Sequence, residues 1–251
     1  MWTRIAILAA VMAAPALSAY ETVRFKAFDG IEITADVYRV NDDLSTPFIL
    51  LFHQAGYSRG EYRDVAPRLN KLGYNCMAVD LRSGSGVRGV INETASEAQL
   101  KSKDITYLDA ETDILDALFY AREHYARGPI ILWGSSYSAS LSLLVASERP
   151  RVISGVVAFS PGEYFNDLDK PYGWIAKNAR KLEMPVFIAS ARNEERRWDV
   201  IFHGMYSEKK VSFRPEETPG MHGSRALWPD TPDSEAYWQA VTAFLKKYFP
   251  A

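Results

Sequence analysis

Short, continuous apolar runs recur along this 251-residue chain and alternate with longer segments that have polar faces. Such runs are typical of strands that are buried on both faces of a parallel sheet. The runs cover residues 48–52, 74–81, 130–133, 152–159 and 186–189. Strands that alternate with helices in this way predict an α/β fold with a mostly parallel, doubly wound sheet.

The segments between and after these runs complete the predicted fold. Apolar spacing predicts helices over residues 60–72, 104–126, 136–147 and 234–248. It also predicts a last strand over residues 209–214. The Asp29-Gly30 pair, a strong turn signal, separates two strand-like segments and predicts an N-terminal antiparallel hairpin. No repeat, linker or low-complexity tract follows, so we expect residues 20–251 to form a single domain.

The N-terminal segment, residues 1–19, differs from the rest of the chain. Arg4 supplies a positive charge, residues 5–17 are apolar, and the small residues Ser18 and Ala19 follow. This order is typical of a secretory signal peptide that is cleaved after one of the two small residues. The apolar run is too short to span a bilayer, so we expect a secreted or periplasmic protein with no membrane span after cleavage.

Charge and cysteine content exclude several classes of function. The formal net charge is −2 and the pI is about 6.1. The chain therefore lacks the basic excess needed to bind nucleic acid or an anionic membrane. Cys76 is the single cysteine, so no intramolecular disulfide can form. It lies in an apolar stretch, residues 75–79, where a buried and unreactive thiol is expected.

One motif raises the question of a nucleotide cofactor. Residues 84–89 match G-x-G-x-x-G after a predicted strand. A dinucleotide site requires a helix that opens within the motif, but the next helical pattern begins near Asp104. We therefore interpret these glycines as a flexible loop. The four histidines are scattered and no paired cysteines exist, so the sequence predicts neither a metal nor any other cofactor.

A serine-rich turn follows the apolar run 130–133. Residues 134–138 read Gly-Ser-Ser-Tyr-Ser and lead into a predicted helix. The turn is close to the pattern G-x-S-x-G, in which a strained strand-to-helix turn projects a serine hydroxyl into solvent. Small residues are needed two positions before and after that serine; Gly134 meets this requirement, and Ser138 replaces the second glycine. The strand before it and the helix after it favour Ser136 as a nucleophile over a helix-capping serine.

A serine hydroxyl needs a base and an orienting acid to act as a nucleophile at neutral pH. Where a serine occupies such a turn, the partners follow in the order acid, then histidine. His222 lies in a loop between the last predicted strand and the closing helix. The acid should follow the strand that ends at residue 189, where Glu194 is our choice and Glu195 the alternative. A carboxylate beside the histidine would fix its tautomer and stabilise the imidazolium.

Several separate motifs together resemble the α/β-hydrolase superfamily, closest to small exported esterases of the dienelactone-hydrolase and prolyl-oligopeptidase-like branch. Besides the hairpin and the turn around Ser136, the motifs are residues 50–56 (LLFHQAG), 78–82 (AVDLR) and 221–223 (MHG). The resemblance covers nearly all of the chain after the signal peptide. It implies an α/β-hydrolase fold with at most a small cap.

The resemblance also assigns roles to residues outside the proposed triad. It implies an oxyanion hole made of the backbone amides of Ala55 and Tyr137, which would stabilise a tetrahedral intermediate. His53 would then be a structural residue of its loop, and Asp80 and Arg82 would be chiefly structural.

These observations predict a carboxylic-ester hydrolase that cleaves a small ester or lactone through an acyl-enzyme. Residues 162–182 lie between two strands, where this fold often inserts a lid, and so short a segment predicts an open site. The aromatic residues that we expect to contact a small, ester-like substrate are Tyr57, Tyr164, Phe165 and Trp174. The alternatives are a peptidase or amidase, and a non-catalytic binding protein that retains the fold.

Overall fold

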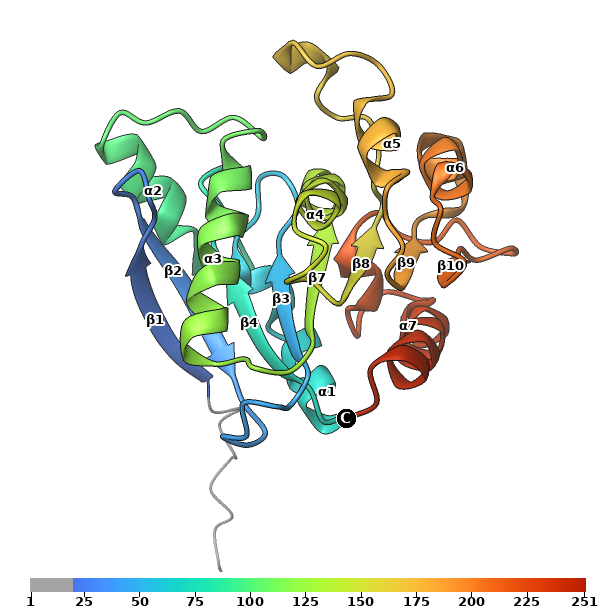
Figure 1. Cartoon of the computed structure of the whole chain (residues 1–251), viewed down its shortest axis with the longest axis horizontal. Coiled ribbons are helices and arrows are strands. Elements are labelled where there is room, and N and C mark those ends of the chain that lie inside the picture. Colours follow the sequence, from blue (N-terminus) through green and yellow to red (C-terminus); the bar gives the residue numbers. More distant parts are fainter. Residues whose placement is uncertain (1–19) are drawn as a thin grey trace, which may run out of the picture.

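The structure, a computed structural model, describes residues 20–251. The predicted signal peptide, residues 1–19, lies outside the described residues. An eight-stranded sheet forms the centre of the described chain, in the order β1-β2-β4-β3-β7-β8-β9-β10 (Figure 1). Its strands are β1 (Tyr20–Lys26), β2 (Glu32–Tyr38), β3 (Phe48–Phe52), β4 (Asn75–Val79), β7 (Ile130–Ser135), β8 (Gly155–Phe159), β9 (Val186–Ala189) and β10 (Lys210–Phe213).

The sheet is parallel except at its N-terminal edge. β1 pairs antiparallel with β2, and β2 pairs antiparallel with β4. Every other neighbouring pair in this sheet runs parallel. The predicted hairpin and the predicted, mostly parallel sheet are both confirmed. Parallel strands bring their carboxyl ends to one edge, which is where ligands bind in open α/β sheets.

Helices cover both faces of the sheet, as expected for a doubly wound fold (Figure 1). They are α1 (Val65–Lys71), α2 (Glu93–Leu100), α3 (Ala110–His124), α4 (Tyr137–Glu148), α5 (Trp174–Ala179), α6 (Glu195–Gly204) and α7 (Ser234–Tyr248). Helices α2 to α6 contribute to one buried cluster, which includes Ile114, Leu141 and Ile201. Helices α1 and α7 contribute Leu69 and Trp238 to a second cluster on the opposite face.

Two predicted helices are shorter in the structure than their sequence patterns. The segment 60–72 divides into a 3-10 helix, Arg59–Tyr62, and α1. The helix predicted over residues 104–126 begins only at α3. Thr106 causes the delay, because its amide and hydroxyl both donate to Asp109 Oδ2, at 2.8 and 2.6 Å, and form a turn there.

The sequence pattern missed α2, which lies in the polar stretch after β4. Asn92 caps this helix, and its side chain accepts a hydrogen bond from Ala95 N at 2.8 Å. Few of its side chains are apolar, and Leu100 at its end is 83% exposed. An apolar periodicity was therefore absent from the sequence of this helix.

The glycine motif, residues 84–89, contributes to a small hairpin of β5 (Gly86–Val87) and β6 (Val90–Ile91). Gly84 packs directly against backbone, because a Cβ there would lie 2.2 Å from Tyr57 O. No helix opens within the motif, since the next helix is α2. The first of these glycines therefore allows this hairpin to pack closely beside the loop after β3.

Buried ion pairs fix the chain at the end of β4. Asp80 Oδ2 accepts from Arg59 Nη1 at 2.5 Å, and Arg82 Nη2 donates to Asp113 Oδ1 at 2.7 Å. Both pairs connect the end of β4 to a neighbouring element. Asp80 and Arg82 thus have the structural surroundings that the family resemblance implied.

Cys76 lies within β4 and is fully buried. Burial raises the pKa of its thiol far above the ordinary range, which fits the prediction of an unreactive side chain. Among residues 20–251, no helix is long and apolar enough to cross a membrane.

Candidate active site

Ser136 occupies the sharp turn between β7 and α4. Figure 1 shows this turn at the carboxyl edge of the sheet. Its backbone has φ 60° and ψ −121°, a region that residues other than glycine rarely occupy without a functional reason. Gly134 makes the turn possible, because a Cβ there would lie 2.3 Å from Ser138 O. The strained strand-to-helix turn expected from the sequence is present.

Ser138 stands where the usual pattern has a second glycine. Its buried hydroxyl donates to Phe52 O at 2.8 Å and accepts from Ser135 N at 2.9 Å. The departure from the pattern is therefore accommodated, because the serine side chain ties the turn to the end of β3.

Glu194 and His222 meet at the same edge of the sheet. Glu194 ends a 3-10 helix, Arg192–Glu194, shortly after β9, and His222 lies in the loop between β10 and α7. His222 Nδ1 and Glu194 Oε1 are 2.5 Å apart. Burial acts to raise the pKa of Glu194, but hydrogen bonds from His222 and Ser160 outweigh burial and lower this pKa. Glu194 is therefore an ionised acceptor in contact with the imidazole.

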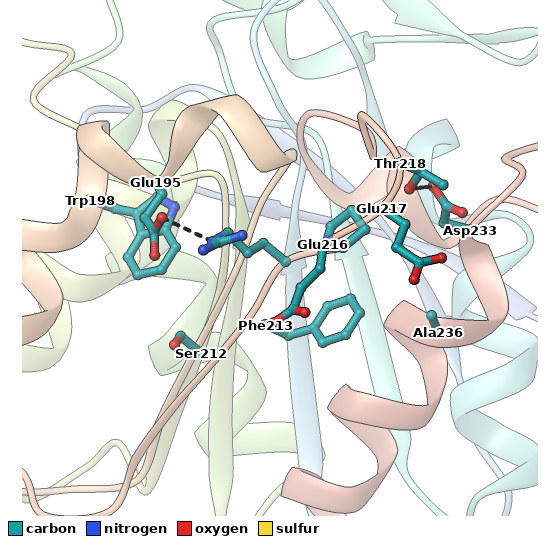
Figure 2. A pocket seen from close by; sticks show the side chains of 11 residues that line it. Glu195, Trp198, Ser212, Phe213, Glu216, Glu217, Thr218, Asp233 and Ala236 are labelled. Carbon is teal, nitrogen blue, oxygen red and sulfur yellow. Dashed lines mark hydrogen bonds and ion pairs between the residues drawn. The ribbon is translucent and has the colours of Figure 1, made fainter.

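Glu195, the alternative acid, has a different partner. Its Oε2 lies 3.0 Å from Arg214 Nε, and its side chain lines a cavity of about 620 Å³ beside β10 (Figure 2). This cavity is larger than the two of about 320 and 300 Å³ that Tyr164 lines, and none of the three has a member of the proposed triad in its lining. Figure 2 shows that Asp233, in the same cavity, accepts a hydrogen bond from the Thr218 hydroxyl. We place the candidate active site by its side chains and not by cavity size, at the edge of the sheet where Ser136 follows β7 and Glu194 contacts His222.

Ser160, which the sequence reasoning did not select, supports the acid. It follows β8 directly and has φ 55°, a left-handed conformation that is strained for serine. Its hydroxyl donates to Glu194 Oε2 at 2.7 Å and accepts from Gly223 N at 2.9 Å. Ser160 thus connects the acid to the residue that follows His222. A polar residue directly after a buried strand was the only signal in the sequence.

The two predicted oxyanion donors have free backbone amides. Within residues 20–251, neither Ala55 N nor Tyr137 N donates to a protein acceptor. Gln54 N, by contrast, is occupied, because it donates to Glu61 Oε2 at 2.7 Å. A backbone amide without a protein acceptor is what an oxyanion hole requires.

His53 holds the loop that carries Ala55. Its Nδ1 lies 2.8 Å from Gln54 O, and its Nε2 accepts from Leu81 N at 2.9 Å. Nδ1 therefore carries the proton. Burial lowers the pKa of His53 to about 4, so the imidazole is neutral and fits the structural role implied by the resemblance.

Tyr164 is hydrogen-bonded to the backbone of Ser160, the residue that supports Glu194. Its hydroxyl donates to Ser160 O at 2.7 Å. Burial raises the pKa of Tyr164, whereas a contact with the Ser136 hydroxyl lowers it. Among the described residues, Ser136 Oγ forms no hydrogen bond with His222. Such bonds often form only when substrate is bound.

Two cavities meet at Tyr164. One, of about 320 Å³, is lined also by Tyr172 and Arg197, and the other, of about 300 Å³, by Ile105 and Tyr107. Of the four predicted aromatic residues, Tyr164 is the one that lines both of these cavities.

The other three aromatic candidates have packing partners. Tyr57 stacks on Trp228 with ring centroids 6.1 Å apart. Phe165 is only 1% exposed and packs edge-on against Trp174. Phe165 therefore packs in the core of this structure, and the expectation that it contacts substrate stays a prediction.

The fold and this geometry define the chain as an α/β-hydrolase. A family model described as serine aminopeptidase, S33 matches residues 45–187, which is more than half of the sequence. The chain belongs to this family. The S33 family is a hydrolase family, and the resemblance found in the sequence is confirmed.

Comparison with individual proteins gives two kinds of similarity. Monoglyceride lipases from Mus musculus and Rattus norvegicus are 32% and 30% identical to the chain over 118 residues. The aligned part is 46% of this chain but only 36% of each lipase. The chain thus spans about a third of the length of these relatives.

Solved structures match over nearly the whole chain at lower identity. They include a dienelactone hydrolase from Anabaena variabilis (TM-score 0.68, 15% identity, covering 92% of this chain and 98% of that one). An esterase from Pyrococcus furiosus has the same TM-score at 16% identity, covering 92% of this chain and 93% of that one. The esterase Est1E from Butyrivibrio proteoclasticus also has a TM-score of 0.68 at 16% identity, covering 92% and 99%. These similarities confirm the α/β-hydrolase fold.

Proposed function

We propose that this chain is a serine hydrolase that cleaves a small ester or lactone, with Ser136 as nucleophile, His222 as base and Glu194 as orienting acid. One observation carries the proposal: a serine held in a strained turn lies at the edge where a histidine and a carboxylate are 2.5 Å apart. Membership of a hydrolase family supports it.

The reaction follows from these roles. His222 Nε2 accepts the Ser136 proton as the serine oxygen attacks the carbonyl carbon. The amides of Ala55 and Tyr137 donate to the oxyanion that forms. The bond to the alcohol oxygen then breaks, and the alcohol leaves with the proton from His222. Water attacks the acyl-enzyme in the same way, His222 takes the proton of that water, and Ser136 recovers a proton as the acid is released.

The surroundings of Tyr164 favour a substrate of modest size. We infer that the acyl and alcohol parts occupy the two cavities of about 320 and 300 Å³ on either side of this ring. Dienelactone hydrolase and esterases among the structural neighbours agree with an ester or lactone. The ester class is therefore our first choice.

Labelling with a fluorophosphonate probe tests the nucleophile. We expect the wild-type chain to be labelled and Ser136→Ala to remain unlabelled and inactive towards p-nitrophenyl butyrate. Labelling that persists in Ser136→Ala would remove the basis of the proposal, and a wild-type protein that is never labelled would favour the non-catalytic binding protein.

Amide hydrolysis is the second candidate, because the family description names an aminopeptidase. A direct comparison of kcat/KM for p-nitrophenyl butyrate and for aminoacyl p-nitroanilides separates the two activities. We expect the ester to be preferred by far, and a higher kcat/KM for the anilides would assign the chain to amide hydrolysis.

We also propose export, on the basis of residues 1–19 alone. The N-terminal sequence of protein purified from the source cells tests this expectation. A mature chain that begins at Ala19 or Tyr20 would agree with it, and a chain that retains Met1 would contradict it.

A further inference from the structure

A second carboxylate lies beneath the candidate active site and has no part in the reaction proposed above. Glu61 belongs to the 3-10 helix Arg59–Tyr62 and is completely buried. Its Oε2 accepts from Gln54 N at 2.7 Å, and its Oε1 accepts from the Ser135 hydroxyl at 2.7 Å. Gln54 precedes one proposed oxyanion donor, Ala55. Ser135 precedes the proposed nucleophile.

The same network reaches the histidine loop. The Ser135 hydroxyl that donates to Glu61 accepts from Ser224 N at 2.8 Å, and Ser224 lies two residues after His222. The three loops are in close contact here, because a Cβ on Gly223 would lie 2.6 Å from Ser135 Oγ. One carboxylate therefore connects the oxyanion loop, the serine turn and the histidine loop.

Burying the Glu61 carboxylate costs folding free energy. This cost points to a role beyond filling the core. Within residues 20–251, the Glu61 carboxylate accepts hydrogen bonds but forms no salt bridge. Burial raises the pKa of Glu61 to about 7, against the opposing effect of those hydrogen bonds. An apolar side chain of similar size would avoid this penalty but would accept neither hydrogen bond.

We propose that Glu61 is a positioning residue that sets the distance between the oxyanion hole and the nucleophile. This proposal rests on the function proposed above. Glu61 touches no reacting atom and acts through the peptide before Ala55 and through Ser135. When the carboxylate is replaced, the loop after β3 and the serine turn lose their common acceptor. The amide of Ala55 then no longer meets the oxyanion at the correct distance.

The effect should appear in the transition state and leave ground-state binding unchanged. Misplacement of a catalytic group by about 1 Å costs up to about 100-fold in rate. We expect Glu61→Gln to lower kcat by about 10- to 100-fold while KM changes by less than about 3-fold. Gln keeps the size of Glu and one acceptor oxygen. When that oxygen accepts from Gln54 N, the NH2 group of Gln faces Ser135 and cannot accept its hydroxyl proton.

The decisive experiment compares Glu61→Gln, Ser135→Ala and the double variant in the full chain. Each protein is assayed with p-nitrophenyl butyrate and with a trifluoromethyl ketone, whose adduct with Ser136 places an oxyanion in the hole. Affinity for the ketone should fall by the same factor as kcat/KM. Because both substitutions break the same contact, the double variant should be little worse than either single variant. Ser142→Ala is the matched control, a buried serine in α4 that bonds to Ser138 O and should retain wild-type kcat.

Each outcome has a separate meaning. Wild-type kcat in folded Glu61→Gln and in Ser135→Ala, beside an inactive Ser136→Ala, would overturn the role of Glu61 alone. Full activity in Ser136→Ala would instead overturn the proposed function, and with it the role of Glu61. A rise in KM with unchanged kcat would also contradict the positioning role. If Glu61→Gln does not fold by circular dichroism, Ser135→Ala decides the question by the same criteria.

Discussion

Two serine–carboxylate pairs hold the loop of His222. In each pair the serine hydroxyl donates to a carboxylate and accepts from a backbone amide of the loop. On one side, Ser160 donates to Glu194 and accepts from Gly223 N. On the other side, Ser135 donates to Glu61 and accepts from Ser224 N. Two consecutive amides after the histidine are therefore each held by a serine that is itself bonded to a carboxylate.

The two carboxylates differ in what else they touch. Glu194 contacts the imidazole of His222, and its pKa is lowered. Glu61 forms no hydrogen bond with an imidazole of residues 20–251 and is completely buried, and its pKa is raised to about 7. The comparison teaches that a serine–carboxylate pair does not by itself identify the acid of a triad. Contact with the histidine separates the proposed orienting acid from the proposed positioning residue.

Replacing Glu194 should have the largest effect on activity. In Glu194→Gln the side chain can no longer accept both the Nδ1 proton and the Ser160 hydroxyl proton, so the imidazole loses its required tautomer. We expect kcat to fall by about 10⁴-fold, as when the acid of a serine triad is made neutral. Glu195→Gln is the matched control, because its partner is Arg214, and its kcat should remain near wild type. Equal losses in the two variants would remove the distinction between these neighbours.

The two carboxylates should also give opposite dependences of stability on pH. The pKa of Glu61 rises from 4.5 to about 7 on folding, so its stabilising contribution is present below pH 4.5 and is lost as pH rises through 7. This loss is about 3 kcal/mol, and Glu61→Gln should abolish it. For Glu194, whose pKa is lowered on folding, the contribution is present above pH 4.5 and is lost at lower pH.

Urea denaturation of wild type, Glu61→Gln and Glu194→Gln from about pH 3 to about pH 8 measures this difference, because the Glu194 contribution changes below pH 4.5 and the Glu61 contribution above it. Relative to wild type, Glu61→Gln should gain stability as pH rises from 4.5 through 7, and Glu194→Gln should lose stability as pH rises from about 3 to 4.5. Other buried groups, such as His53, titrate in all three proteins and cancel in the difference. Parallel curves for the two variants would contradict the assignment of opposite pKa shifts.

Two substitutions at Ser160 separate the effect of its hydroxyl on kcat from the effect of its backbone strain on stability. Ser160→Ala and Ser160→Gly both remove the hydrogen bonds to Glu194 and Gly223, and we expect kcat to fall by about 10-fold in each. Glycine relaxes the left-handed backbone at φ 55°, so Ser160→Gly should be more stable than Ser160→Ala by about 1 kcal/mol. Thermal unfolding and kcat measured together test both parts. Normal kcat in Ser160→Gly with low kcat in Ser160→Ala would show that strain, and not the hydroxyl, matters.

The turn at Ser136 was predictable because it depends on neighbours in sequence. A buried strand, a glycine and a helix within a few residues specify the strained backbone. The order of acid and histidine depends on chain topology, which the alternation of strands and helices already indicated. The choice of Glu194 over Glu195 was harder, because it depends on where a 3-10 helix of three residues ends.

The contacts of Glu61 and Ser160 could not be predicted from neighbours in sequence or from chain topology. The Ser135–Glu61 bond joins residues 74 positions apart, and the Ser160–Glu194 bond joins residues 34 apart. Neither contact has a sequence motif, since each depends on how loops from different strands meet at one edge. A glutamate in a short helical turn reads as a solvated surface residue until its burial is known.

Tyr164 should give the smallest change and the most direct information on substrate shape. Tyr164→Phe removes the hydrogen bond to Ser160 O but keeps the ring between the two cavities, so we expect kcat to fall by no more than about 3-fold. Tyr164→Ala removes the ring and joins the cavities, which should raise the preference for p-nitrophenyl octanoate over the butyrate by about 3-fold. Chain-length profiles of kcat/KM for wild type and both variants measure this. An unchanged profile in Tyr164→Ala would mean that the acyl chain lies elsewhere, because a ring that borders both cavities limits the length of chain that either can hold.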